Sequence, residues 1–491
     1  MPTATPDLVN LFAESDALRL GELVRQKEVT PAELTETAIR LIQTLDPKLN
    51  AVIIRDFERA KARARESSTN GPFGGVPYLL KNIGSGCEGL PLTNSLPFRK
   101  DYVSPSDSEM VRRIKASGLN ILGRTNVPEQ GWCIATEPRM YGPTVNPWNT
   151  AVTAGGSSGG AVSAVASRMI PMAEASDGGG SIRAPASCCG VVGLKPSRGR
   201  ITYGPDDVDI WFGSVSTFAV TRSVRDTAAL LDATAVVMPG DPYTPPKPAQ
   251  SWLDCLRDPI EPLKIGYALT PPWGAPFAPE VTDAMKQTLS VLENLGHALE
   301  EHAMVTDLEA AWRDYNQMNS VQTLLEFEDM AKVLGRPIPE SELIAFNRAW
   351  LERGRSLSAH DYAMSVAAVR KANQSVQVEL APYDVFLTPT LTQLPRPVGY
   401  WDLNERDFDK YIATWTDAAF LFPFNLSGLP AISVPAAWTN DDIPIGVQLV
   451  GRYGDEATIL RLSAQLEEAR PWIQRRPSIC AGASSQAAAA H

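Results

Sequence analysis

The chain has 491 residues, of which 44% are hydrophobic and 21% are charged, a composition typical of soluble globular proteins that excludes the disordered, collagen-like and membrane-embedded classes. Its 45 lysines and arginines against 56 aspartates and glutamates give a net charge of −11. No basic block occurs that could neutralise a run of phosphates, so a nucleic-acid partner is not expected.

The amino-terminal half alternates helix and strand patterns. Thr30 is predicted to cap a helix that continues to about residue 45, with Pro31 at its first position and Glu33 completing a capping box. The strand patterns that follow predict strands over 51–54, 78–80, 120–122 and 170–174. The helix patterns predict helices over 56–67 and 107–116, a helix after Ser158, and a helix over 223–237. Strands that alternate with helices indicate an α/β fold with a mixed or parallel sheet.

The carboxy-terminal half opens with a proline-rich stretch at 239–262, which predicts a long surface connection. Residues 306–380 are helical in pattern almost throughout, and they indicate a helical layer packed on the sheet or, as the alternative, a helical insertion over a site. The other patterns predict strands over 264–267, 298–300, 385–387, 431–434 and 446–449 and helices over 281–295 and 455–469. We expect one domain over residues 1–480 and a disordered tail over 481–491.

The sequence also bears on compartment and redox state. Residues 1–20 lack a basic segment followed by an apolar one, and no stretch of 18 apolar residues occurs, so neither a secretory signal nor a membrane span is expected. We therefore expect a cytoplasmic protein with no membrane partner. The six cysteines form no Cys-x-x-Cys pair, and they are expected to be reduced and mostly buried: Cys87, Cys133, Cys188, Cys189, Cys255 and Cys480.

Two glycine-rich motifs suggest nucleotide binding but lack the residues that it needs. Residues 84–89 fit G-x-G-x-x-G, yet Leu90 and Pro91 stand where a helix must begin to hold a pyrophosphate. The run at 155–160 cannot belong to a Walker A loop, because the chain has no Gly-Lys dipeptide. No cofactor is expected.

Histidine-based chemistry is equally unexpected. None of the four histidines has a metal-ligand spacing such as H-E-x-x-H, so no metal site is expected. Residues 155–160 match the G-x-S-x-G nucleophile motif, whose triad needs a downstream histidine. Because His297, His302 and His360 lie in polar, peripheral stretches, a Ser-His-Asp triad is not expected either.

Residues 155–195 form the most unusual stretch of the chain, rich in glycine and serine. Gly178, Gly179 and Gly180 precede Ser181, and successive glycines let a chain turn tightly and present several N–H groups to one point, as an oxyanion hole requires. A serine nucleophile needs a base to accept its proton. With no histidine nearby, a buried lysine held neutral is the remaining type of base.

The signature of the amidase signature family resembles three segments of this chain, residues 155–160, 177–183 and 189–196. The spacings agree, since Ser157 and Ser181 are 24 residues apart and Lys81 lies 76 residues before Ser157. The resemblance covers about residues 10–470, because further similar stretches lie at 124–128, 145–148, 387–390, 425–430 and 444–448.

This resemblance implies an amidase signature fold, a twisted mixed sheet of about eleven strands covered by helices on both sides. It also implies a Ser-cisSer-Lys triad in which Ser181 is the nucleophile, Ser157 is the bridging serine on a cis peptide bond and Lys81 is the base. The oxyanion-hole amides would come from Ser181 itself and from Gly178, Gly179 and Gly180.

Other residues receive supporting roles. Asp177 and Arg183 are expected to form an ion pair that holds the glycine loop, a structural role rather than a chemical one. Gly131, Trp132 and Cys133 correspond to a stretch that faces the acyl pocket in relatives, although a plain core position is the alternative for Trp132.

The resemblance implies a cofactor-independent hydrolase of small-molecule amides that works through an acyl-enzyme, and esters and carbamates are chemically allowed. The sequence is most similar to the branch that includes 6-aminohexanoate-cyclic-dimer hydrolase and related xenobiotic amidases. It departs from the common family pattern at Asn82, Ser176 and Gly178. These departures leave the three triad positions intact and bear on the substrate, since a glycine at position 178 can widen the site.

Two other functions are alternatives to amide hydrolysis by this chain alone. A glutaminase like the signature-bearing subunit of glutamyl-tRNA amidotransferase is the first, and such an enzyme works with partner chains. A binding protein that has lost activity is the other, and the intact Lys81, Ser157 and Ser181 argue against it. A homodimer is left open.

Overall fold

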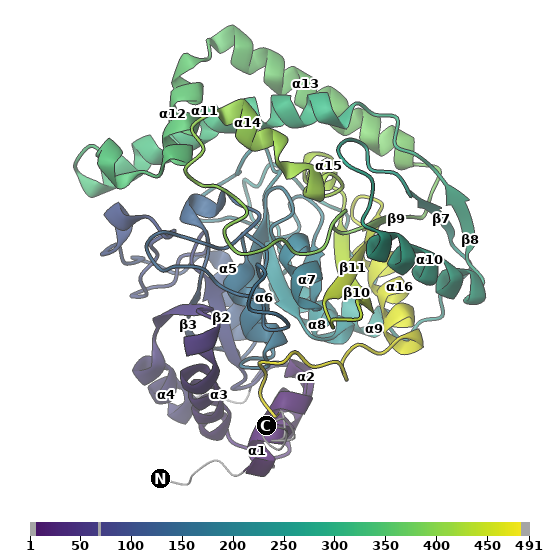
Figure 1. The fold of residues 1–491 in the computed structure, drawn as a ribbon. Coiled ribbons are helices and arrows are strands. Elements are labelled where there is room, and N and C mark those ends of the chain that lie inside the picture. Colours follow the sequence, from purple (N-terminus) through teal and green to yellow (C-terminus); the bar gives the residue numbers. More distant parts are fainter. Residues whose placement is uncertain (1–5, 67–69, 483–491) are drawn as a thin grey trace.

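The computed structural model describes residues 6–66 and 70–482 of the chain. These residues form a mixed sheet of eleven strands in the order β1-β3-β2-β4-β6-β5-β10-β11-β9-β7-β8, with helices around it (Figure 1). The predicted α/β fold is thereby confirmed. The strands are β1 (Val52–Arg55), β2 (Pro77–Lys81), β3 (Asn120–Thr125), β4 (Met172–Asp177), β5 (Val192–Lys195), β6 (Ser216–Thr221), β7 (Lys264–Tyr267), β8 (Ala298–Glu301), β9 (Val385–Pro389), β10 (Ala431–Trp438) and β11 (Pro444–Gly451).

Parallel and antiparallel pairs both occur in this sheet. Strand β2 lies parallel to β3 and β4, and β7 lies parallel to β8 and β9. Antiparallel pairs join β4 to β6, and β10 to β5 and β11. Because β2 and β4 are parallel neighbours, their carboxyl ends lie at the same edge of the sheet, and these ends carry Lys81 and Ser176.

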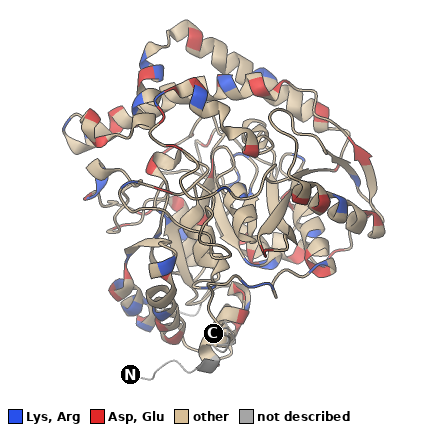
Figure 2. Ribbon diagram, viewed as in Figure 1, with Lys and Arg blue, Asp and Glu red and all other residues tan. Residues whose placement is uncertain are grey.

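Helices surround the sheet, and Figure 1 shows α1–α4 at one end of the molecule and α11–α13 together at the opposite end. Basic and acidic residues are interspersed along these outer helices (Figure 2). The helices are α1 (Pro6–Glu14), α2 (Ala17–Arg25), α3 (Pro31–Leu45), α4 (Phe57–Glu66), α5 (Glu109–Ala116), α6 (Gly159–Ala166), α7 (Arg183–Cys189), α8 (Val224–Thr234), α9 (Trp252–Cys255), α10 (Pro279–Asn294), α11 (Leu308–Leu334), α12 (Ala345–Ser356), α13 (Ala359–Leu380), α14 (Phe408–Ala413), α15 (Phe422–Leu426) and α16 (Glu456–Ala469).

Most predicted elements are confirmed to within a few residues. The capping box of α3 is complete, because the Glu33 N–H donates to Thr30 Oγ1 and the Glu33 carboxylate accepts the Thr30 N–H. Helix α8 likewise begins after its predicted cap, with the Asp226 N–H donating to Ser223 Oγ. Strands β5 and β6 lie where the sequence patterns predicted none.

Two expectations about irregular segments are wrong in part. The stretch at 239–262 is not a surface connection throughout, since it contains the short helix α9. Trp252 of this helix packs into the core and is only 4% exposed. In the predicted tail at 481–491, Ala481 is buried and its N–H donates to the carbonyl oxygen of Ser167, so disorder does not begin at residue 481. The remainder of the predicted tail, residues 483–491, lies outside the described residues.

The region at 306–380 folds as α11, α12 and α13, and both α12 and α13 pack against α11. It is therefore helical, as predicted, with breaks at 335–344 and 357–358 that are mostly turn and irregular chain. Helix α11 also lines a cavity, through Trp312, Tyr315 and Glu326 among others. The division into a single domain over 1–480 stays a prediction.

The expectation for the cysteines is confirmed, since all six are buried and none forms a disulfide. Burial raises the pKa of Cys133 to about 11 and that of Cys188 to about 12, so both thiols stay protonated at neutral pH. Within residues 6–66 and 70–482, no helix combines the length and apolarity that crossing a bilayer requires.

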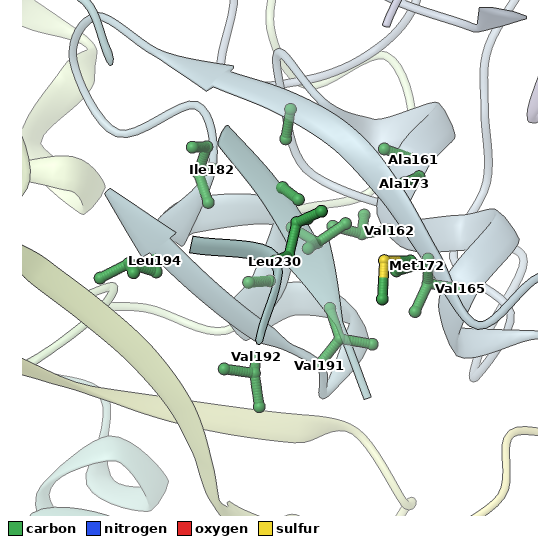
Figure 3. Packing of buried hydrophobic residues seen from close by; sticks show 14 of the residues in the cluster. Ala161, Val162, Val165, Met172, Ala173, Ile182, Val191, Val192, Leu194 and Leu230 are labelled. Carbon is green, nitrogen blue, oxygen red and sulfur yellow. The ribbon is translucent and has the colours of Figure 1, made fainter. Parts of the chain in front are cut away.

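The core is tightly packed next to the segments that carry the signature serines. Figure 3 shows Val162 and Val165 of α6 close to Met172 and Ala173 of β4, and all four side chains are buried. Burying a valine or methionine side chain stabilises the fold by about 1.5–3 kcal/mol. The packing fixes the start of α6, which follows Ser157, relative to the end of β4.

Candidate active site

Lys81 is the last residue of β2, and its side chain is almost completely buried. Its Nζ donates to Ser157 Oγ at 2.9 Å, to Ser176 Oγ at 2.9 Å and to the Ser176 carbonyl oxygen at 3.2 Å. The fold therefore brings the predicted lysine into direct contact with the first of the two predicted serines.

The charge state of Lys81 is set mainly by its burial. Burial lowers the pKa of Lys81 to about 7, although the carboxylates of Asp177 and Glu174 act in the opposite direction. A lysine with this pKa is neutral in a large fraction of molecules near pH 7. Such an amine can accept a proton, which an ordinary surface lysine cannot do at this pH.

The backbone of Lys81 is held on both sides by buried charged side chains. Glu174 Oε2 accepts the Lys81 N–H at 2.8 Å, and Arg124 Nη1 donates to the Lys81 carbonyl oxygen at 2.8 Å. Burial raises the pKa of Glu174 to about 7, with Arg124 and Lys81 among the groups that lower it. These contacts fix the position of the lysine relative to the serines.

Ser157 lies in a glycine-rich turn between β3 and α6. The Gly156–Ser157 peptide bond is cis. A Cβ added at Gly156 would lie 2.6 Å from the Cys133 carbonyl oxygen, so only glycine fits there. Thr136 Oγ1 secures the turn, because it donates to the Gly155 carbonyl oxygen at 2.9 Å and accepts the Gly159 N–H at 3.1 Å.

Ser181 follows the three glycines in the loop between β4 and α7. The Gly180 N–H donates to Asp177 Oδ1 at 2.7 Å, and a Cβ added at Gly180 would lie 2.4 Å from Leu421 Cδ1. Gly180 therefore faces the protein interior. Gly178, Gly179 and Ser181 face the other way and line a cavity.

Asp177 and Arg183 form the expected ion pair beneath this loop, and both side chains are fully buried. Arg183 Nε and Nη2 donate to the two Asp177 oxygens at 2.9 Å each. Although burial opposes ionisation, the guanidinium holds the pKa of Asp177 well below its usual range. Asn425 Nδ2 also donates to Asp177 Oδ1 at 2.8 Å, and Arg183 Nη1 donates to Gln448 Oε1 at 2.6 Å.

Arg183→Met is expected to lower the free energy of unfolding by about 3–5 kcal/mol, because it leaves the Asp177 carboxylate buried without a counter-charge. Chemical denaturation of the wild type and the variant measures this difference. The double variant Asp177→Asn/Arg183→Met removes both charges and should recover part of the loss. Equal losses in the single and double variants would show that charge compensation does not hold the loop.

A cavity of about 630 Å³ opens beside the serines. Ser157, Ser176 and Ser181 lie on its wall, together with Gly178 and Gly179. Aromatic residues from several segments also line this cavity: Tyr102, Trp132, Tyr203, Trp211, Trp312, Tyr315, Trp350, Tyr411 and Trp415. The cavity can accept a small organic molecule and exposes it to the serine hydroxyls.

Of the three residues predicted to contact substrate, two line the cavity and one does not. Gly131 and Trp132 line the cavity, whereas Cys133 does not. Cys133 lies behind the wall because its side chain is 1% exposed and its Sγ accepts the Ala135 N–H at 3.3 Å. A Cβ added at Gly131 would lie 3.4 Å from Ser157 Oγ, so this glycine borders the serine directly.

Sequence reasoning missed the residues that complete the cavity from distant segments. Trp211 comes from the connection between β5 and β6, and Tyr315 and Glu326 come from α11. No motif marks any of the three. The one signal was the unusual Gly178, since a Cβ there would lie 2.8 Å from Trp211 Cζ3.

Comparisons with known proteins agree with this geometry. The amidase family model matches residues 33–460. The 6-aminohexanoate-cyclic-dimer hydrolase of Paenarthrobacter ureafaciens is 37% identical over 94% of this chain and 96% of its own length. A solved structure of 6-aminohexanoate cyclic dimer hydrolase superimposes with a TM-score of 0.91 at 35% identity, covering 95% of this chain and 99% of that one.

A bacterial aryl acylamidase structure is also similar, with a TM-score of 0.84 at 26% identity over 94% of this chain and 97% of that one. The family model covers most of the chain, and the relative and the solved structure cover 94% and 95% of it. The chain is therefore a member of the amidase signature family, a hydrolase that acts on amide carbon–nitrogen bonds.

Proposed function

We propose that this amidase works through a Ser-cisSer-Lys triad in which Ser181 is the nucleophile, Ser157 relays a proton and Lys81 is the base. The observation that carries the proposal is the 2.9 Å hydrogen bond between Lys81 Nζ and Ser157 Oγ, on a lysine whose pKa is lowered to about 7. Both serines lie on the wall of one cavity, where a substrate can reach them.

The proton route follows from the valence of a neutral amine. Such an amine has two N–H groups and one lone pair, and Lys81 Nζ has two acceptors on Ser176 within 3.2 Å. It can therefore donate to Ser176 while its lone pair accepts the Ser157 hydroxyl proton. Ser157 in turn takes the proton of Ser181 as Ser181 Oγ attacks the carbonyl carbon.

The attack places a negative charge on the substrate oxygen, and backbone amides would stabilise it. Gly178, Gly179 and Ser181 are the residues of this loop that line the cavity. The Gly180 N–H, which the resemblance also assigned to the oxyanion hole, donates to Asp177. It can take part only by sharing its hydrogen between that carboxylate and the substrate.

Collapse of the tetrahedral intermediate breaks the carbon–nitrogen bond and leaves an acyl group on Ser181. The leaving amine takes back the proton that Lys81 received, again through Ser157. A water molecule then attacks the acyl-enzyme and releases the acid. Esters and carbamates form the same kind of oxyanion, so they are candidate substrates as well.

A partner-dependent glutaminase, like the signature-bearing subunit of glutamyl-tRNA amidotransferase, is the alternative. The likeness to 6-aminohexanoate-cyclic-dimer hydrolase over 94% of the chain favours an enzyme that acts on small amides instead. A cytoplasmic location and a homodimer stay predictions.

The purified chain, without glutamine or partner proteins, is the test of this proposal. It is assayed on small aliphatic amides, anilides, cyclic amides including the 6-aminohexanoate cyclic dimer, carbamates and esters, beside Ser181→Ala. We expect the wild type to hydrolyse at least one amide and the variant to hydrolyse none at a comparable rate. Turnover that depends on glutamine or on added partner chains would favour the alternative.

A further inference from the structure

Trp211 is held in an unusual backbone conformation next to the catalytic loop. It lies in the connection between β5 and β6, where Trp211, Phe212 and Gly213 have φ values of 52°, 53° and 68°. Left-handed backbone is unfavourable for bulky residues, and it persists where the surroundings impose it. Contacts with the neighbouring residues therefore hold this turn in place.

One constraint is the fit between Trp211 and the catalytic loop. A Cβ added at Gly178 would lie 2.8 Å from Trp211 Cζ3 and 3.2 Å from Trp211 Cε3. The absence of a side chain at Gly178 therefore makes room for the indole ring. Because Gly178 precedes Ser181 by three residues, the ring lies against the loop that carries the nucleophile.

A second constraint is a cluster of aromatic rings, in which Trp211 stacks on Trp132. The ring centroids of Trp211 and Trp132 are 4.3 Å apart, with an interplanar angle of 22°. The ring centroids of Trp132 and Trp350 are 3.8 Å apart, with the rings tilted by 37°. Tyr315 meets Trp211 edge-on with centroids 6.5 Å apart. All four rings line the cavity, so they form one continuous aromatic wall.

Glu326 of α11 joins the two loops that carry this wall. Its Oε1 accepts the Trp211 Nε1–H at 2.9 Å, and its Oε2 accepts a Gln130 Nε2–H at 2.8 Å. Gln130 lies two residues before Trp132, so one carboxylate holds the indole of Trp211 directly and the loop of Trp132 through Gln130. Hydrogen bonds donated to a charged acceptor are stronger than those between neutral groups, which suits a positioning role.

The wall borders the reacting atoms on two sides. Trp211 contacts Gly178 of the catalytic loop, and Trp132 follows Gly131, whose added Cβ would lie 3.4 Å from Ser157 Oγ. A substrate group attached directly to the scissile amide must therefore lie near these indoles. Flat apolar rings gain most from such a surface, because stacking adds to the effect of burial.

We propose that Trp211 is a specificity-determining residue that selects amides with a flat apolar ring next to the scissile bond. The inference rests on the proposed function and names the substrate class of the same site. Trp211 acts by contact with the ring of the substrate, whereas Glu326 acts through Trp211 and is a positioning residue.

The test compares substrates of equal size that differ in flatness. Benzamide and cyclohexanecarboxamide place the ring on the acyl side, and acetanilide and N-cyclohexylacetamide place it on the amine side. The ratio of kcat/KM within each pair is measured for the wild type and Trp211→Ala, so that intrinsic reactivity cancels between enzymes. We expect the ratio to fall about tenfold in at least one pair, which identifies the side that the wall contacts.

Phe212→Ala is the matched control. Phe212 has the same backbone conformation as Trp211, but its ring contacts Tyr362 with centroids 6.5 Å apart, and it is not among the described residues that line the cavity. It should leave both ratios unchanged within twofold. A similar fall in this control would attribute the effect to the turn rather than to the indole.

Trp211→Phe and Trp211→Leu keep the test decisive if the alanine variant folds poorly. Both lose the hydrogen bond to Glu326, but only phenylalanine keeps a flat ring. We expect Trp211→Phe to retain most of the preference for flat substrates and Trp211→Leu to lose it.

Three outcomes separate this inference from the proposed function. Ratios that stay within twofold in every Trp211 variant, while amides are still hydrolysed, would overturn the inference alone. A wild type that cleaves other amides but neither flat substrate would also overturn it alone. A wild type that cleaves no amide at all would overturn the proposed function.

Discussion

Replacement of Ser181 with alanine is expected to lower kcat/KM for amide hydrolysis about 10⁴-fold or more, because the acyl-enzyme can no longer form. The loop should survive the change, since Asp177 holds it through the Gly180 N–H, the Ile182 N–H and the Arg183 side chain. Steady-state kinetics on the best amide of the wild type measures the loss. Residual catalysis from the backbone amides is expected.

Ser104→Ala is the control for this experiment. Ser104 lines the same cavity, and its buried hydroxyl makes no hydrogen bond to any described residue. Removing it should therefore change kcat/KM by less than about threefold, since no contact is lost. A Ser181→Ala variant as active as Ser104→Ala would rule out Ser181 as the nucleophile.

Lys81→Met is expected to lower kcat/KM to a similar extent, about 10⁴-fold, because neither serine then has a base for its proton. Methionine fills much of the same buried space without a charge, so it suits this site better than a polar residue. The thermal midpoint of the variant should stay near that of the wild type. A variant that keeps more than about a tenth of the activity would exclude Lys81 as the base.

The pH dependence of the wild type follows from the same lysine. The base must be neutral, and its pKa lies near 7, so kcat/KM should fall about tenfold for each pH unit below that value and level off above it. Lys81 and Glu174 lie close together, so the observed limb belongs to both groups. Glu174→Gln removes a charge that favours the protonated lysine, and the limb should move to lower pH. A shift to higher pH would contradict this electrostatic coupling.

The sequence was most informative where chemistry demands particular residues at fixed spacings. Lys81, Ser157 and Ser181 were assigned together, and the fold places Lys81 against Ser157 and both serines on one cavity. Strands β5 and β6 were not predicted because their apolar runs are short: Gly193 and Lys195 interrupt β5, and β6 opens on Ser216 and Thr217. A segment of four or six buried residues does not reveal its conformation from periodicity alone.

The aromatic wall could not be predicted from the sequence, for a different reason. Trp211 and Glu326 are 115 residues apart, and nothing local indicates that they meet through a hydrogen bond. Their meeting depends on where α11 lies relative to the connection between β5 and β6, which is a property of the whole fold. Gly178 was recognised as unusual, and the position of Trp211 explains what the missing side chain makes room for.

Trapping the covalent intermediate tests the central claim most directly. An ester or activated amide is mixed with the enzyme, the reaction is quenched in acid during turnover, and the digested protein is analysed by mass spectrometry. We expect an acyl group on the peptide that contains Ser181, and none in Ser181→Ala. Acylation of another residue, or rapid turnover with no acylated peptide at any time, would contradict the serine acyl-enzyme mechanism.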